Sequence, residues 1–163
     1  MSYLFEIGDK IIYPMQGAGV IQGIEEKDFS GEKKKYYIIK MLTNNMQLMI
    51  PMDRIIDSNL RLVTNESTLD KILLDLNTTD FSSNDNISSK QRYQSNMDKI
   101  KSGSLKENLE VVYDLTCLSK EKSLNSTEKQ MLTNARKFLV DEIILVKNLT
   151  EDEADNLLDE NIN

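Results

Sequence analysis

The chain contains no histidine and no tryptophan, and it has only one cysteine, two prolines and six glycines among its 163 residues. Without an imidazole it cannot build histidine-zinc sites, serine or cysteine nucleophile systems with a histidine base, or histidine general acids. A single cysteine, Cys117, excludes an internal disulfide, and its helical surroundings predict a buried small side chain and not a nucleophile. These absences argue against an enzyme.

Long apolar runs and phosphate-binding motifs are also missing. No stretch approaches the roughly 20 apolar residues of a membrane helix, and the first residues lack the basic and apolar regions of a secretory signal. Gly17-Ala18-Gly19 is not followed by the Gly-Lys-Ser/Thr of a phosphate loop. We therefore expect a cytoplasmic protein with no cofactor, no metal and no membrane partner.

The first 65 residues or so are patterned as short strands separated by Gly, Pro and Asn. Pro14, Gly17 and Gly19 predict a turn between the first two strands, and a turn at 43–45 joins the last two. The charged segment 28–34 is predicted to be a solvated loop. The strands are expected at Ile11–Tyr13, Val20–Ile24, Lys35–Met41 and Met46–Ile50.

From about Leu69 the apolar residues recur at helical spacing. Asn125-Ser126-Thr127-Glu128 is typical of a capped helix start, with the Asn125 side chain accepting from first-turn amides. Polar residues 77–89 predict a loop. The helices are expected at about 69–76, 89–101, 105–120, from 126 onward and about 151–158.

Strands followed by helices, without alternation, indicate an α+β chain. We expect a small, strongly bent β domain over residues 1–66 and a helical bundle over residues 67–163.

The charge of the chain is unevenly distributed. The total is −7, yet between residues 90 and 137 ten basic residues outnumber six acidic ones, and from residue 141 on eight acidic residues face one lysine. A modest basic patch suits a few salt-sensitive phosphate contacts, although from charge alone such lysines are more often ordinary solvated helix faces. Because this basic patch would bind DNA only weakly, the protein would have to reach DNA by docking on a larger assembly.

Two sets of residues resemble the CarD/CdnL family of bacterial transcription regulators. The first half matches in Phe5, Gly8-Asp9, Tyr13-Pro14, Gly17-x-Gly19, Gly31-Glu32, Tyr36-Tyr37, Ile50-Pro51 and Leu60-Arg61-x-Val63. The second half matches in Arg92-Tyr93-x-x-Asn96-x-x-Lys99-Ile100-x-Ser102-Gly103, Glu110–Leu115, and Leu124 to Leu139 with Glu128-Lys129, Met131-Leu132 and Ala135-Arg136. The opening alone would also fit the polymerase-interacting module of the transcription-repair coupling factor.

The resemblance implies a Tudor-like small β-barrel that binds the β subunit of RNA polymerase and a helical domain that meets promoter DNA at the upstream edge of the melted bubble. Such a protein is a non-enzymatic regulator that stabilises the open complex made with the housekeeping sigma factor. It would act as a monomer in the bacterial cytoplasm, associated with the nucleoid through the polymerase.

The residues that the resemblance assigns to polymerase binding are Lys27, Glu32, Met49 and Pro51. Lys27 keeps the basic residue of the family's second strand. Met49 replaces a second basic residue just before the Val/Ile-Pro step, which predicts a more apolar or weaker contact.

On the DNA side, the family's wedge tryptophan falls at Ser89, and a serine cannot prop apart a partly unstacked base step. Ile87 is a possible substitute. We expect instead a mainly electrostatic contact through Lys90, Arg92 and Lys129, with Gln91 and Gln94 as polar partners at the same site as Ser89. Tyr93 is predicted to belong to the core, because it begins the apolar stripe of Met97 and Ile100.

An alternative from a different class stays open. The β domain would bind polymerase while the helical half recruits another protein through its acidic C-terminal segment, and DNA would not be touched. The missing tryptophan keeps this adaptor open as an alternative. Neither the responding promoters nor the direction of regulation follows from the sequence.

Overall fold

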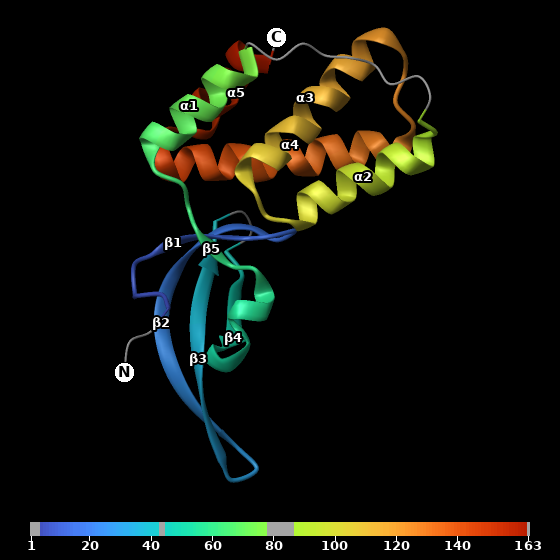
Figure 1. Ribbon diagram of the computed structural model, residues 1–163. Helices are drawn as coiled ribbons and strands as arrows, with labels where there is room; N and C mark the ends of the chain where they lie inside the picture. The colour runs from blue at the N-terminus through green and yellow to red at the C-terminus, as the bar shows by residue number, and fades with distance from the viewer. Residues whose placement is uncertain (1–3, 43–44, 78–86, 163) are drawn as a thin grey trace.

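A computed structural model describes residues 4–42, 45–77 and 87–162. A curved antiparallel sheet forms the first half of the chain, and helices form the second half, stacked on one end of the sheet (Figure 1). The α+β class predicted from the sequence is therefore confirmed. No helix among these residues has the length and apolar character that crossing a bilayer would demand.

The sheet has five antiparallel strands in the order β4-β3-β2-β1-β5. Two short 3-10 turns, Met52–Arg54 and Ile56–Ser58, connect β4 to β5. The strands are β1 (Lys10–Tyr13), β2 (Gly17–Phe29), β3 (Glu32–Met41), β4 (Gln47–Pro51) and β5 (Arg61–Leu62).

A bulge in β2 decides which side chains of this strand face the core. Ile21 pairs with Ile39, and the register then shifts so that Gly23 pairs with Ile38. Because strand side chains alternate between faces, the extra residue lets Ile21 and Ile24 both contact the core although they are three positions apart. The same shift turns the odd-numbered residues beyond Gly23 to the outer face.

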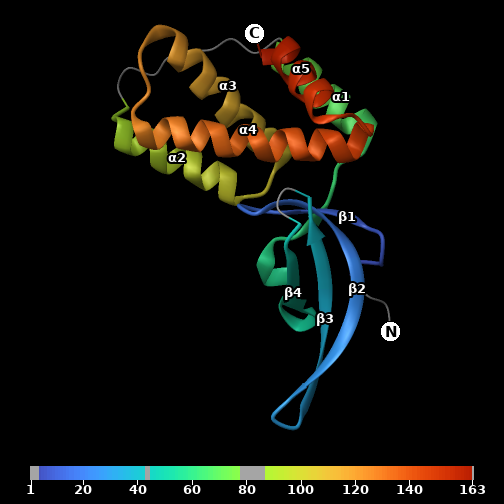
Figure 2. The same cartoon turned by 180° about the vertical axis from the view of Figure 1, so that it is seen from behind.

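The segment 28–34 is not the loop that its charges predicted. β2 continues to Phe29, β3 begins at Glu32, and only Ser30 and Gly31 form the turn. Both turn residues have positive φ angles, 55° and 87°, as a two-residue type I′ hairpin requires, and Gly31 adopts this conformation without a Cβ penalty. The resulting β2–β3 hairpin projects away from the helices (Figure 2).

The helices pack around α4, which contacts α1, α3 and α5 and also reaches β2. Their buried residues form one cluster, and the sheet has a separate cluster of its own. Of the loop expected over 77–89 and the turn expected over 43–45, residues 78–86 and 43–44 lie outside the described residues. The helices are α1 (Glu66–Asn77), α2 (Ser89–Lys101), α3 (Leu105–Glu121), α4 (Ser126–Lys147) and α5 (Glu151–Ile162).

Side-chain caps account for the starts of α1 to α4. Asn125 caps α4 by accepting a hydrogen bond from the Glu128 amide at 2.8 Å, as its sequence predicted. Ser88 caps α2 in a reciprocal capping box with Gln91, and Ser104 caps α3. α1 begins three residues before the expected Leu69, where Asn65 accepts from the Thr68 amide.

Candidate functional site

The four residues assigned to polymerase binding share one face of the sheet. In the antiparallel ladder, Met49 lies opposite Ile38 and Pro51 opposite Tyr36, while Lys27 lies opposite Lys34 and Glu32 opposite Phe29. Paired residues project to the same side, and alternate residues of β3 do so as well. The outer face of β2, β3 and β4 therefore gathers these eight side chains, which we call the outer sheet face.

The outer sheet face is accessible and mixed in character. Met49 is 43% exposed and Phe29 is 58% exposed, although both are apolar. Lys27 keeps 44% of its side chain exposed and forms an ion pair with Glu25 at 3.3 Å. Since an exposed pair of this kind stabilises a protein very little, Lys27 can exchange Glu25 for an acidic partner at small cost.

Two aromatic residues of this face were not among the predicted site residues. The rings of Phe29 and Tyr36 meet edge to face, with their centroids 6.1 Å apart. Because Phe29 lies in the segment that was predicted to be a loop, it was not recognised as sharing a strand face with Lys27. The two-residue spacing of Lys27 and Phe29 could have indicated that shared face.

The residues assigned to DNA binding lie at one end of the helical part, where α2 and α4 begin. Ser89, Lys90 and Gln91 occupy the first turn of α2, and Lys129 is exposed near the start of α4. Gln94 is exposed one turn along α2 and donates to Asp98 at 3.3 Å. Both helices start at the same side of the bundle (Figure 1), so two positive helix ends lie beside the two lysines.

Arg92 is directed toward Glu128 of α4 and keeps 23% of its side chain exposed. Its Nε and Nη2 donate to the two carboxylate oxygens of Glu128 at 2.6 and 2.8 Å, and Glu128 is only 1% exposed. The hydrogen bond to Glu128 raises the pKa of Arg92 above its ordinary value, and burial lowers it by less. Arg92 thus joins α2 to α4, and its role at a DNA surface stays a prediction.

Tyr93 and Ile87 lie near Ser89, the position at which the family's tryptophan is expected. Tyr93 is partly buried and packs on the helical core, as its spacing with Met97 and Ile100 predicted. Ile87 is 38% exposed just before the capped start of α2. A groove of about 370 Å³ runs between α2 and α4 at this end, bordered by Tyr93, Ser126 and Gln130 among others.

The described part of the chain holds no group of three or more Cys, Asp or Glu side chains that could bind a metal ion. Its chemistry at the two surfaces is that of charged, amide and apolar groups, which suits recognition of a protein or of phosphates.

Comparisons with known proteins agree on one family. Residues 5–63 match the family model of the CarD-like/TRCF RID domain, and residues 71–159 match the model of the CarD C-terminal domain. "Putative transcription factor YdeB" of Bacillus subtilis (strain 168) is 47% identical over 149 residues, which are 91% of this chain and 95% of the relative.

A solved structure of CdnLNt from Myxoccoccus xanthus shares 38% sequence identity over 36% of this chain and 80% of its own, with a TM-score of 0.30. The two family models and the relative cover both halves of the chain in order. The chain therefore belongs to the CarD family of transcription factors.

Proposed function

We propose that this protein is a non-enzymatic regulator of transcription initiation that docks on the β subunit of RNA polymerase and stabilises the open promoter complex. The observation that supports this most is the separation of two surfaces. All four residues assigned to polymerase binding lie on the outer sheet face, and the exposed lysines assigned to DNA lie at the far helical end.

The outer sheet face fits a protein partner better than a nucleic acid. Its centre is apolar, with Met49 beside the buried Ile38, and its rim contains charges of both signs at Lys27 and Glu32. Interfaces between proteins commonly combine an apolar centre with a polar rim. Met49 in place of a basic residue shifts this docking toward apolar contact.

The helical end fits phosphate contacts of low sequence specificity. Lys90 and Lys129 supply charge, Ser89, Gln91 and Gln94 supply polar groups, and two helix N-termini supply favourable dipoles. Without a tryptophan wedge, we expect these contacts at the minor groove of the upstream bubble edge to be electrostatic.

Linkage explains how weak contacts can regulate initiation. A factor that binds the open promoter better than the closed one shifts their balance by that difference in affinity. Docking on polymerase raises the effective concentration of the lysines near the DNA, so a few contacts suffice.

The test measures docking and open-complex lifetime separately. Lys27→Glu is expected to weaken polymerase binding, while Lys33→Glu is the matched control, because Lys33 occupies the opposite face of the same hairpin.

Lys90→Ala with Lys129→Ala is expected to shorten the open-complex lifetime without changing docking, and Lys71→Ala on α1 is the control. No polymerase binding by the parent protein would reject the proposal.

A second candidate, the adaptor that does not touch DNA, is favoured by α5. The first turn of α5 presents Glu151, Asp152 and Glu153 to solvent. Glu151 also borders a groove of about 850 Å³ that is lined by residues of α4 and α5 and by Leu42. Footprinting of the upstream bubble edge separates the two: protection that depends on Lys90 and Lys129 supports DNA contact, and an unchanged footprint supports the adaptor.

A further inference from the structure

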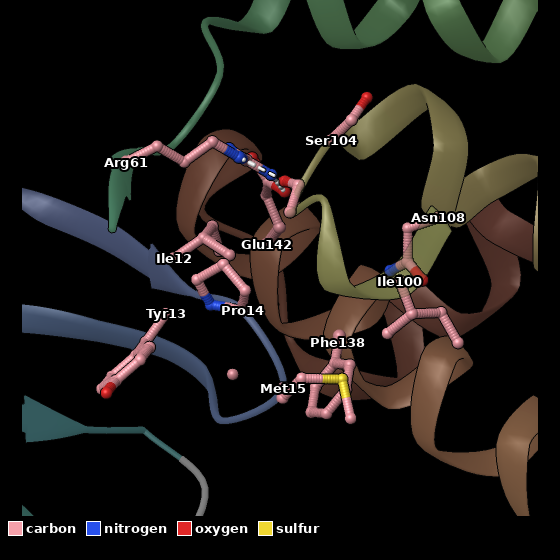
Figure 3. Close-up of a pocket in the computed structure, with 12 residues that line it drawn as sticks. Ile12, Tyr13, Pro14, Met15, Arg61, Ile100, Ser104, Asn108, Phe138 and Glu142 are labelled. Carbon is pink, nitrogen blue, oxygen red and sulfur yellow. Dashed lines mark hydrogen bonds and ion pairs between the residues drawn. The ribbon is translucent and has the colours of Figure 1, made fainter. Parts of the chain in front are cut away.

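The junction between the sheet and the helices combines apolar contacts, such as those around Pro14 and Phe138, with a polar cluster around one arginine. Arg61 lies in the short edge strand β5, where it pairs with Ile12 of β1, so its backbone position is set by the sheet. Its side chain crosses to the helical part and meets Glu142 of α4 (Figure 3).

The contact between Arg61 and Glu142 is bidentate. Nη1 and Nη2 of Arg61 donate to the two carboxylate oxygens at 2.8 and 2.7 Å, and Nε donates to the carbonyl of Gly103 at 2.7 Å. One planar guanidinium thus holds α4 and the turn between α2 and α3 at once. Such a fork defines an orientation as well as a distance.

Glu142 is buried at this junction and accepts hydrogen bonds from Arg61 and Thr64. It is 2% exposed, and the backbone amide of Thr64, in the segment after β5, donates to it at 3.0 Å. A buried carboxylate with three donors of fixed direction tolerates little rotation of one part against the other, because each lost bond leaves a desolvated charge.

Close packing leaves little room around the pair. A Cβ added at Gly103 would lie 2.8 Å from Cγ of Pro14, and Gly103 has a φ of +76°. The small pocket that Arg61, Gly103 and Glu142 border has a volume of about 20 Å³, which is about the size for one water molecule. The two parts are therefore in direct contact around this pair.

α4 connects this junction to the predicted DNA end. The helix has 22 residues, about 33 Å at 1.5 Å per residue. Glu142 anchors it to the sheet, and Glu128, about 21 Å away along the axis, anchors its start to Arg92 of α2. Both carboxylates are buried and both accept two hydrogen bonds from one arginine.

We infer that Arg61 and Glu142 are positioning residues that lock the helical part onto the sheet, so that α4 presents Lys129 at a set angle to the docked outer sheet face. The inference rests on the proposed function. If the two parts are held rigidly, the effective concentration of the lysines near the DNA is high. If the two parts rotate against each other, the lysines occupy a larger volume and their effective concentration falls.

The experiment uses the full chain with Arg61→Met and Glu142→Leu combined, since either change alone leaves a buried or half-buried charge without its partner. The matched control is Arg136→Met, on the same helix, whose ion pairs at 2.7 Å hold Asp155 and Asp159 of α5 and not the sheet. Arg61→Lys keeps the charge and loses the planar fork.

Two readouts are needed. Spin labels at Lys40→Cys and Gln130→Cys, in a Cys117→Ser background, report the distribution of distances between the two parts. We expect one narrow distribution for the parent and for Arg136→Met, and a broad one for the double variant. The same double variant is expected to bind polymerase as the parent does. It is also expected to shorten the open-complex lifetime about tenfold, which corresponds to a loss of about 1.4 kcal/mol in stabilisation of the open complex.

Arg61→Lys should fall between the parent and the double variant in both readouts. A narrow distribution in a folded double variant would overturn the inference, and so would a broad distribution with an unchanged open-complex lifetime. If the parent itself does not affect open complexes, the proposed function fails, and the distance distributions still decide whether the pair locks the two parts.

Discussion

Buried charge is the feature that matters most at the scale of single residues. Glu128 and Glu142 of α4 are 1% and 2% exposed, and each is matched by one arginine. Removing one partner of such a pair is costly because the other charge stays buried, although replacing both by apolar groups is often neutral. This distinction determines which variants can test function.

Arg92→Met is expected to lower the free energy of unfolding by about 3–5 kcal/mol, because it leaves Glu128 buried without its guanidinium. Combining it with Glu128→Leu should recover most of the loss. Urea unfolding followed by circular dichroism measures both, with Lys90→Ala as a control that should match the parent. Near-parent stability of Arg92→Met would mean that this pair does not hold α2 to α4.

Asp114 predicts a pH dependence of stability. Burial raises the pKa of Asp114, with Lys99 lowering it and Glu110 raising it by less. When a carboxyl has a raised pKa in the folded state, ionising it lowers the free energy of unfolding. This destabilisation is absent below the ordinary aspartate pKa and present at neutral pH.

Asp114→Asn should therefore raise the free energy of unfolding at pH 7, and the gain should disappear as the pH falls through the ordinary range of aspartate. Denaturant unfolding at pH 3 to 7 measures it, with exposed Asp98→Asn for comparison. A gain that grew toward low pH would contradict the assigned direction.

At the scale of elements, α2 and the β2–β3 hairpin position the two candidate surfaces. The first turn of α2 presents Ser89 and Lys90 because Ser88 caps it, with the Ser88 hydroxyl accepting from the Gln91 amide at 3.2 Å. The hairpin extends the outer sheet face as far as Phe29 and Glu32 because Ser30 and Gly31 close it in a two-residue turn.

Ser88→Ala is expected to cost about 1 kcal/mol of stability through loss of the cap. Amide hydrogen exchange should locate the loss in the first turn of α2, since fraying begins there. Ser95→Ala, on the exposed middle of the same helix, is the control and should not destabilise, because alanine is the better helix former. Equal exchange in both variants would show that the cap does not hold this turn.

At the scale of the whole molecule, the buried residues of the sheet and of the helices form two clusters, and a junction with both apolar side chains and the Arg61–Glu142 pair joins the two parts. The net charge of −7 disfavours general DNA binding, while the lysines at the start of α2 and α4 stay exposed at one end. This division suits a protein that reaches DNA only after docking.

The proposed DNA contact predicts a dependence on salt concentration. The effect of the protein on open-complex lifetime is expected to decline with salt, and Lys129→Ala should reduce the slope of its logarithm against the logarithm of salt concentration by about 1. Lys71→Ala should leave the slope unchanged. A slope that is the same in the parent and in Lys129→Ala would remove Lys129 from the phosphate contacts.

Local features could be predicted because they depend on neighbouring residues. The bounds of α2 and the Asn125 cap were predicted correctly, since capping groups and apolar spacing act within a few positions. The segment 28–34 was predicted wrongly, because charged strands beyond a core lack the apolar alternation that marks a strand.

The sequence by itself determined the α+β class, the separate charge of the helical half and the family to which the chain belongs. Only the tertiary structure decided where Arg92 and Arg61 point, because their partners lie 36 and 81 positions away. It also placed Lys27, Met49 and Pro51 on one face, through a bulge and a register that involve three strands. Pairing across such separations depends on how elements pack, and no local pattern encodes it.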